Sequence, residues 1–150
     1  MGHTFTRLLY HVVFSTKQRR PTIRTDFRAE LLAYVHGVVR NEDARILESA
    51  AMADHVHLLI SAGPTHALAD LVRVLKTSSS RWVHGKWPDA GACAWQSGYG
   101  AFSVSESSVP RVVAYLKGQE EHHHRVPFGE ELRALLAKHE IPYDAAHFLD

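Results

Sequence analysis

The sequence has few of the features that mark a disulfide-stabilised, zinc-ribbon or membrane protein. Cys93 is the only cysteine among 150 residues, which excludes an intrachain disulfide and a zinc site made of cysteines. A single cysteine also agrees with a reducing compartment. No stretch reaches the roughly 18 consecutive apolar residues of a membrane-spanning helix. The first residues, MGHTFTRLLYHVVF, lack a cleavage site of small residues, so we expect a mature, cytoplasmic protein.

Net charge is also small, at +1, but the charges are unevenly distributed. Acidic residues are absent from residues 1–25 and from residues 71–88, and both segments carry lysine and arginine. Two basic segments in a near-neutral protein predict a local surface for an anionic partner such as DNA. Ordinary solvated surface charge is the alternative for either segment alone. The candidate phosphate contacts are Lys17, Arg19, Arg20, Arg73, Lys76 and Arg81.

The hydrophobic pattern predicts one α+β domain over residues 1–150. Strands are expected at 8–14, 44–51, 55–61 and 102–104, where branched and aromatic residues gather or alternate with polar ones. Helices are expected after Thr25 or Asp26, after Thr65, after Ser107 or Ser108, and from about Gly129. The order β-α-β-β-α-β is that of the ferredoxin-like fold, an antiparallel sheet with both helices on one face. The other face then needs a cover: the C-terminal helices, a partner subunit or a ligand.

Two histidines open the third predicted strand, in the stretch DHVHLLI. Side chains alternate along a strand, so His55 and His57 point to the same face, about 7 Å apart along the chain. Val56, Leu58 and Ile60 then point to the core. Two imidazoles on one face can share a metal ion, whereas the alternative is hydrogen bonding at the sheet surface.

The third predicted helix offers the groups that a histidine pair lacks. Tyr115, Gln119 and His122 are spaced i, i+4, i+7 and share one stripe of that helix. Two imidazoles and an amide oxygen leave room for phosphate oxygens, which favours Mg²⁺ or Mn²⁺ over a closed zinc site. Such an ion polarises a phosphodiester, and a tyrosine beside it can attack phosphorus. Packing of a half-buried tyrosine is the alternative for Tyr115.

Five blocks of the sequence together resemble the single-tyrosine HUH transposases, which include insertion-sequence transposases and REP-associated tyrosine transposases. HUH stands for His-hydrophobic-His, here His55-Val56-His57. The blocks follow the family's order from about Tyr10 to Leu132, most of the chain. They are YHVVFSTKQRRP, MADHVHLLIS, LVRVLKTSSSRW, GYGAFSVSES and YLKGQEEHHHRVPFGEEL.

The resemblance implies an enzyme that cleaves and rejoins single-stranded DNA, often beside a hairpin. It implies that His55, His57 and Gln119 hold a divalent cation and that Tyr115 is the nucleophile. The 5′ phosphate would stay on the tyrosine while a free 3′ hydroxyl is released. The resemblance also implies a ferredoxin-like core and a homodimer in which the tyrosine helix of one subunit docks on the histidines of the other.

Several features leave alternatives open. Gly118 interrupts the predicted tyrosine helix, where glycine costs roughly 1 kcal/mol. The run His122-His123-His124 offers surplus ligands, so His122 could replace Gln119. Asp54 is either a cap or a hydrogen-bond partner of the histidine pair. Aromatic side chains that could stack on unpaired bases, or merely pack, are Trp82, Trp87, Trp95 and Tyr99.

Three other classes of protein compete with this interpretation. A ferredoxin-like sheet can bind RNA without catalysis, although such sheets display aromatic residues where this chain has histidines. A replication-initiator-type HUH nuclease would use a third histidine as ligand. A barrel metallohydrolase with paired histidines would need about 250 residues.

Overall fold

A computed structural model describes residues 2–90, 93–123 and 125–150. Its sheet has four strands, β1 (Leu8–Ser15), β2 (Arg45–Ala51), β3 (His55–Ala62) and β4 (Gly100–Val104). They lie in the order β2-β3-β1-β4, and every neighbouring pair is antiparallel. This is the ferredoxin-like order, which confirms the predicted fold class.

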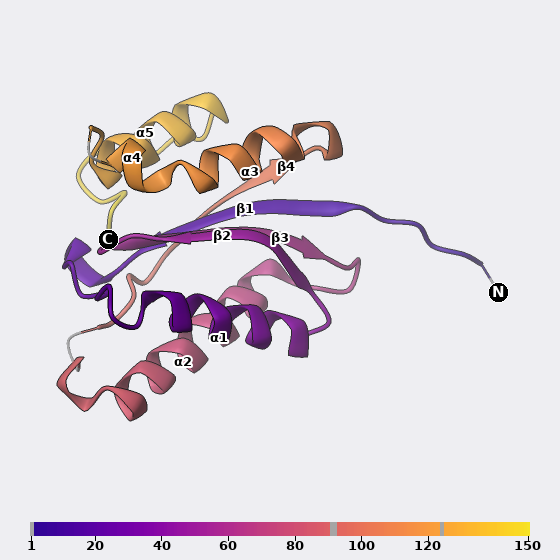
Figure 1. Ribbon diagram of the computed structural model, residues 1–150. Helices are drawn as coiled ribbons and strands as arrows, with labels where there is room; N and C mark the ends of the chain where they lie inside the picture. The colour runs from indigo at the N-terminus through magenta and orange to yellow at the C-terminus, as the bar shows by residue number, and fades with distance from the viewer. Residues whose placement is uncertain (1, 91–92, 124) are drawn as a thin grey trace.

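Helices cover both faces of the sheet (Figure 1). On one face lie α1 (Arg28–Asn41) and α2 (Leu68–Lys86). On the other lie α3 (Val109–Lys117), α4 (Gln119–His123) and α5 (Phe128–Lys138). Short 3-10 turns are η1 (Lys17–Arg19), η2 (Pro88–Ala90) and η3 (Glu106–Ser108). The C-terminal helices of the same chain therefore cover the face for which the sequence left three candidates.

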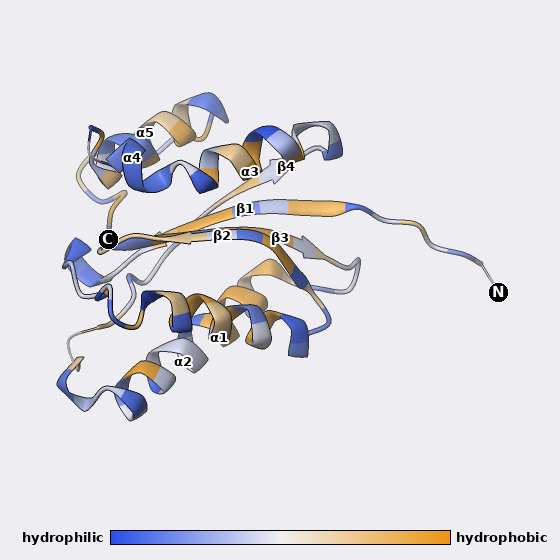
Figure 2. Ribbon diagram, in the orientation of Figure 1, coloured by the Kyte–Doolittle hydropathy of each residue, from blue (hydrophilic) through white to orange (hydrophobic). Residues whose placement is uncertain are grey.

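The central strands are buried on both sides. Val56, Leu58 and Ile60 of β3 face α1 and α2 and are at most 4% exposed, as their alternation predicts. On the opposite face, Val13 of β1 packs with Phe102 of β4 and with apolar residues of α5. Figure 2 shows β1 coloured largely as hydrophobic. Polar side chains on this second face are therefore enclosed between the sheet and the C-terminal helices.

The predicted caps of the first two helices are wrong, whereas Ser108 does occupy the N-cap position of α3. α1 begins at Arg28, and the carboxylate of Asp26 accepts hydrogen bonds from Arg24 instead of from backbone N–H groups. α2 begins at Leu68, beyond Thr65. Among the described side chains, none makes a capping hydrogen bond at the start of α1, α2 or α3. Pro110 does lie in the first turn of α3, as expected from its fixed φ.

The predicted tyrosine helix divides at Gly118 into α3 and α4. Gly118 has φ −90° and ψ 7°, outside the helical range, but backbone hydrogen bonds continue across it. Its N–H donates to Ala114 and its carbonyl accepts from His122. Tyr115 and Gln119 therefore stay one turn apart although they belong to different helices. None of the described helices combines the length and apolar character needed to cross a membrane.

Candidate functional site

The histidine pair lies at the start of β3, on the sheet face covered by α3, α4 and α5. His57 is paired with Val13 of β1 and His55 with Ser15, so both rings sit over a central strand pair. Both residues are 0% exposed. Burying two imidazoles costs free energy unless their nitrogens find partners. Those partners define the site.

Asp54 orients the first histidine. The Nδ1–H of His55 donates to the Asp54 carboxylate over 2.7 Å, which leaves Nε2 pointing into the enclosed space. This Nε2 atom is buried and has no hydrogen-bond partner among the described residues. Burial tends to raise the pKa of Asp54, but the hydrogen bond from His55 and the nearby charges of His55 and His123 together lower it. Asp54 is thus a hydrogen-bond partner of His55.

His11 of β1 orients the second histidine, and sequence reasoning missed it. Its Nε2 lies 2.8 Å from Nδ1 of His57, and the two rings stack with centroids 5.0 Å apart. Burial, together with the neighbouring His57, lowers the pKa of His11 to about 3, so its ring is neutral. The strand alternation that places His11 on the same face as Val13 could have indicated it.

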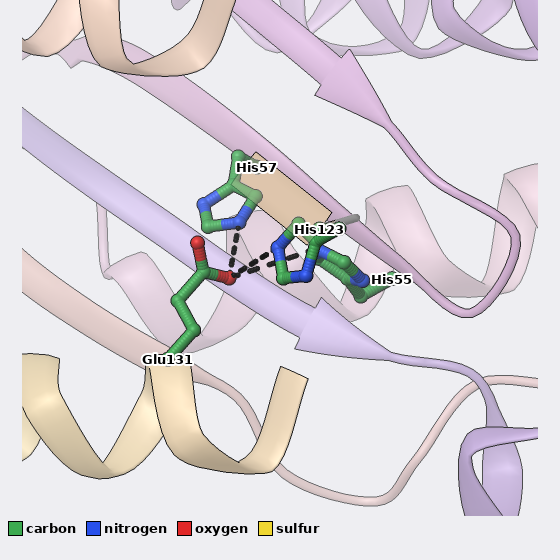
Figure 3. A group of neighbouring side chains, drawn as sticks. All are labelled: His55, His57, His123 and Glu131. Carbon is green, nitrogen blue, oxygen red and sulfur yellow. Dashed lines mark hydrogen bonds and ion pairs between the residues drawn. The ribbon is translucent and has the colours of Figure 1, made fainter. Parts of the chain in front are cut away.

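Glu131 of α5 is the centre of the site and was also missed. Its Oε1 atom accepts hydrogen bonds from Nε2 of His57 at 2.9 Å and from Nε2 of His123 at 3.0 Å. Nε2 of His55 lies 3.6 Å from the same oxygen. Figure 3 shows the three rings gathered around this carboxylate. Burial would raise the pKa of Glu131, but hydrogen bonds from His123 and His57 hold it far below its ordinary range.

Tyr115 of α3 meets the other oxygen of the same carboxylate. Its hydroxyl donates to Oε2 of Glu131, and its ring centroid is 5.8 Å from that of His57. Burial, and then the Glu131 carboxylate, raises the pKa of the phenol above its ordinary value. Tyr115 also lines a cavity of about 700 Å³ between β4, α3 and α5. Basic residues of its wall are Arg111 and Lys138.

The remaining predicted ligands lie around this core. Gln119 is 1% exposed, and neither atom of its amide group has a hydrogen-bond partner among the described residues. His122 comes within 3.3 Å of Glu131 without a hydrogen bond, whereas His123 bonds to it directly. His124 lies outside the described residues. Four donor atoms lie within 4.8 Å of one another and could hold a metal ion; they belong to His55, His57, His123 and Glu131.

The predicted basic surface divides into two parts. Lys17, Arg19 and Arg20 are exposed at η1, next to the site, because Thr16 donates its N–H to the carbonyl of Asp54 over 2.8 Å. The other three residues belong to α2, on the opposite face of the sheet from the histidines. Among them, the Lys76 ammonium donates to the carbonyls of Gln96 and Gly98, and burial lowers its pKa to about 8.

The tryptophans are used for packing. Trp82 stacks on Tyr34 and Trp87 on Phe27, each with ring centroids 4.8 Å apart. Trp95 meets Phe14 edge-on. Tyr99 differs, since it is 38% exposed. Of the aromatic residues considered for base stacking, Tyr99 is therefore the best placed.

Comparison with known proteins first defines a class, the DNA-processing enzymes that act as transposases. The sequence model described as "Transposase IS200 like" matches residues 4–119, well over half of the chain. The chain therefore belongs to the family of IS200-like transposases. The match contains the histidine pair, Tyr115 and Gln119, and it ends before His123 and Glu131.

Individual relatives agree. The chain is 27% identical over 120 residues to the ISDra2 transposase TnpA of Deinococcus radiodurans, covering 77% of this chain and 86% of that protein. It is 26% identical over 153 residues to the IS200 transposase of Salmonella typhimurium, covering 99% and 93%. A crystal structure of a candidate transposase from D. radiodurans superposes with a TM-score of 0.63 at 26% identity, covering 79% and 96%. A REP-associated tyrosine transposase bound to a REP hairpin shares the fold, with a TM-score of 0.61 at 13% identity over 84% and 74% of the two chains.

Proposed function

We propose that this transposase cleaves and rejoins single-stranded DNA through a covalent phosphotyrosine at Tyr115, with a divalent cation bound at the histidine pair. The observation that carries the proposal is the enclosure of Tyr115, His55 and His57 in one site. The tyrosine ring lies 5.8 Å from His57 and shares a carboxylate partner with it. A tyrosine held this close to metal-binding groups is arranged for attack on phosphorus.

The residues present fit a cation. Nε2 of His55 and the amide oxygen of Gln119 are buried and have no partner within the described part of the chain, and such orphaned groups are costly unless a ligand satisfies them. Asp54 and His11 orient the two imidazoles from behind, as partners of metal-binding histidines ordinarily do. His55, His57 and Gln119 would hold the ion, Mg²⁺ or Mn²⁺. When bound, it supplies positive charge that polarises the scissile phosphodiester.

The chain's own residues account for the bond changes. The Tyr115 oxygen forms a bond to phosphorus and passes its proton to the Glu131 carboxylate, which accepts its hydrogen bond. The bond from phosphorus to the 3′ oxygen breaks, and the leaving oxygen takes up a proton from water. The segment of the cleaved strand that carries the 5′ phosphate stays attached to Tyr115, and the other segment leaves with a free 3′ hydroxyl. Attack of a 3′ hydroxyl on the phosphotyrosine reverses the change and joins strands, so the step needs no external source of energy.

The DNA partner is proposed to be a single strand beside a hairpin. Support comes from the similarity in fold to the transposase solved with a REP hairpin. The exposed cations of η1 adjoin Asp54 and the histidines, and phosphate contacts there would position a strand without specifying its sequence. The cavity beside Tyr115 would then receive the cleaved segment.

The structure of a single chain builds this site from residues of that chain. Tyr115, Glu131 and the histidines all belong to the same chain, and α5 packs on Val13 and Phe102 of its own sheet. The homodimer with exchanged tyrosine helices that the resemblance implies is the alternative. Exchange of an identical element would build the same site from two subunits.

A labelled hairpin oligonucleotide tests the nucleophile. Wild-type protein with Mn²⁺ or Mg²⁺ should yield a covalent protein–DNA band on a denaturing gel. Tyr115→Phe removes one oxygen, so it should bind the oligonucleotide normally and give no adduct. Tyr143→Phe, which makes the same change at an exposed tyrosine, is the matched control and should give the wild-type yield. An undiminished adduct with Tyr115→Phe would overturn the assignment and also point to another tyrosine.

A further inference from the structure

Glu131 is the one buried carboxylate among the described residues, and it comes from outside the family match. It is 3% exposed and belongs to α5, whereas the last matched position is residue 119. Helix α5 is anchored by apolar contacts of Phe128, Leu132 and Leu136 with the sheet. Those contacts hold the Glu131 carboxylate next to the histidines. A buried carboxylate is costly unless it is paired or coordinates a metal.

Next to Glu131, the Nε2 atom of His55 has no hydrogen-bond partner among the described residues. His55 gives its Nδ1–H to Asp54, so in the neutral ring Nε2 carries a lone pair. That lone pair faces Oε1 of Glu131 over 3.6 Å in a buried site. Two electron-rich atoms in this position repel each other. A cation between them would turn the repulsion into attraction.

The spacing agrees with ligands of a common ion. Two ligands about 2.1 Å from one ion lie about 3.0 Å apart at right angles and about 3.4 Å apart at tetrahedral angles. Nε2 of His57, His123 and His55 lies 2.9, 3.0 and 3.6 Å from Oε1 of Glu131. When the ring proton of His57 is on Nδ1, its Nε2 lone pair is free to bind a cation. Nε2 of His11 can then accept a hydrogen bond from this Nδ1–H group.

We propose that Glu131 and His123 join His55, His57 and Gln119 as ligands of the divalent cation, and that the second oxygen of Glu131 holds the hydroxyl of Tyr115 beside the ion. The inference rests on the proposed cation at the histidine pair. It adds a carboxylate and a third imidazole from the segment beyond residue 119, and it makes one residue the link between cation and nucleophile. Imidazoles with a carboxylate favour a transition ion such as Mn²⁺ over Mg²⁺.

The test is Mn²⁺ binding without DNA, followed by electron paramagnetic resonance at constant pH. Glu131→Gln keeps the size of the side chain but removes its charge, and it should weaken Mn²⁺ binding at least tenfold. Glu130→Gln, the neighbour on the same helix turn, is the matched control and should bind like wild type. His55→Ala should lose binding. Wild-type affinity in Glu131→Gln, with loss in His55→Ala, overturns the proposal for Glu131 and leaves the proposed function standing.

Absence of Mn²⁺ binding by wild-type protein would instead overturn both the cation of the proposed function and this ligand. A crystal of the wild-type protein soaked in Mn²⁺ keeps the test decisive if Glu131→Gln fails to fold. The anomalous peak should lie about 2.2 Å from a carboxylate oxygen of Glu131. A peak at the histidines with Glu131 turned away from it would refute the ligand role.

Discussion

At the scale of single residues, the site contains two imidazoles, of His55 and His57, whose Nδ1 atoms already have hydrogen-bond partners. Nδ1 of His55 bonds to Asp54 and Nδ1 of His57 to His11, so both Nε2 atoms face inward. An imidazole fixed in this way loses little freedom when it binds an ion, because its orientation is set in advance. We therefore expect the partners behind the histidines to affect affinity for the proposed cation, although they would not be its ligands.

Asp54→Ala tests this orientation. Removing the carboxylate frees the His55 ring and its choice of tautomer, so affinity for Mn²⁺ should fall by about 10- to 100-fold, the usual cost of losing such a partner. Isothermal titration calorimetry gives the affinity. Asp70→Ala on α2 is the matched control, since that carboxylate is exposed and its ion pair with Arg73 is a long one. Equal affinity in wild type and Asp54→Ala would show that His55 is held by its packing alone.

At the scale of elements, periodicity predicted most of the fold. Alternation along β3 identified which residues face α1 and α2, and the order of strands and helices identified the sheet. Periodicity did not predict the hydrogen bonds at the starts of the helices. The Asp26 carboxylate pairs with Arg24, and the same guanidinium also holds Asp89, which lies far along the chain. Whether an acidic side chain caps a helix depends on whether a basic side chain from elsewhere in the fold pairs with it instead. The spacing of residues in the sequence does not show this.

The candidate site was predicted in part for a related reason. His55, His57, Tyr115 and Gln119 are linked by short spacings on one strand and one helical stripe. Glu131 has no such link, since acids in the first turn of a helix are common for electrostatic reasons alone. Only the docking of α5 on Val13 and Phe102 shows that this carboxylate points inward.

The basic turn η1 provides a test at the element scale. The triple change Lys17→Ala, Arg19→Ala, Arg20→Ala should weaken binding of a hairpin oligonucleotide. It should also lower the slope of log affinity against log salt by about 0.7 for each phosphate of a single strand that the variant no longer neutralises. Fluorescence anisotropy over a range of salt concentrations measures both quantities.

The double change Arg73→Ala, Arg81→Ala on α2 is the comparison for this turn. These residues belong to the helix on the face away from the histidines, so the double change should alter the slope less. A larger effect from α2 than from η1 would move the DNA to the opposite face of the sheet.

At the scale of the whole molecule, the sheet is a platform used on both faces. The α1 and α2 face holds the larger apolar core, and the α3 to α5 face holds a smaller one beside the polar site. The strands supply His11, His55 and His57, while the C-terminal helices supply Tyr115 and Glu131. The position of those helices therefore decides whether the chain has a complete site. In the structure they lie on their own sheet (Figure 1).

Mixing two inactive variants tests whether that arrangement also operates in solution. His57→Ala lacks a proposed metal ligand and Tyr115→Phe lacks the proposed nucleophile, so each alone should give no covalent DNA adduct. If each chain builds its own site, every site in the mixture carries one lesion, and the mixture should stay inactive on the hairpin oligonucleotide. If tyrosine helices are exchanged in a dimer, a mixed dimer has one intact site, and adduct should reappear.

Two different affinity tags on the variants establish whether subunits exchange, and tagging also shows which variant carries the DNA. Adduct on the His57→Ala subunit of a mixed dimer would demonstrate assembly between chains, because that subunit holds the intact tyrosine and must use the histidines of its partner.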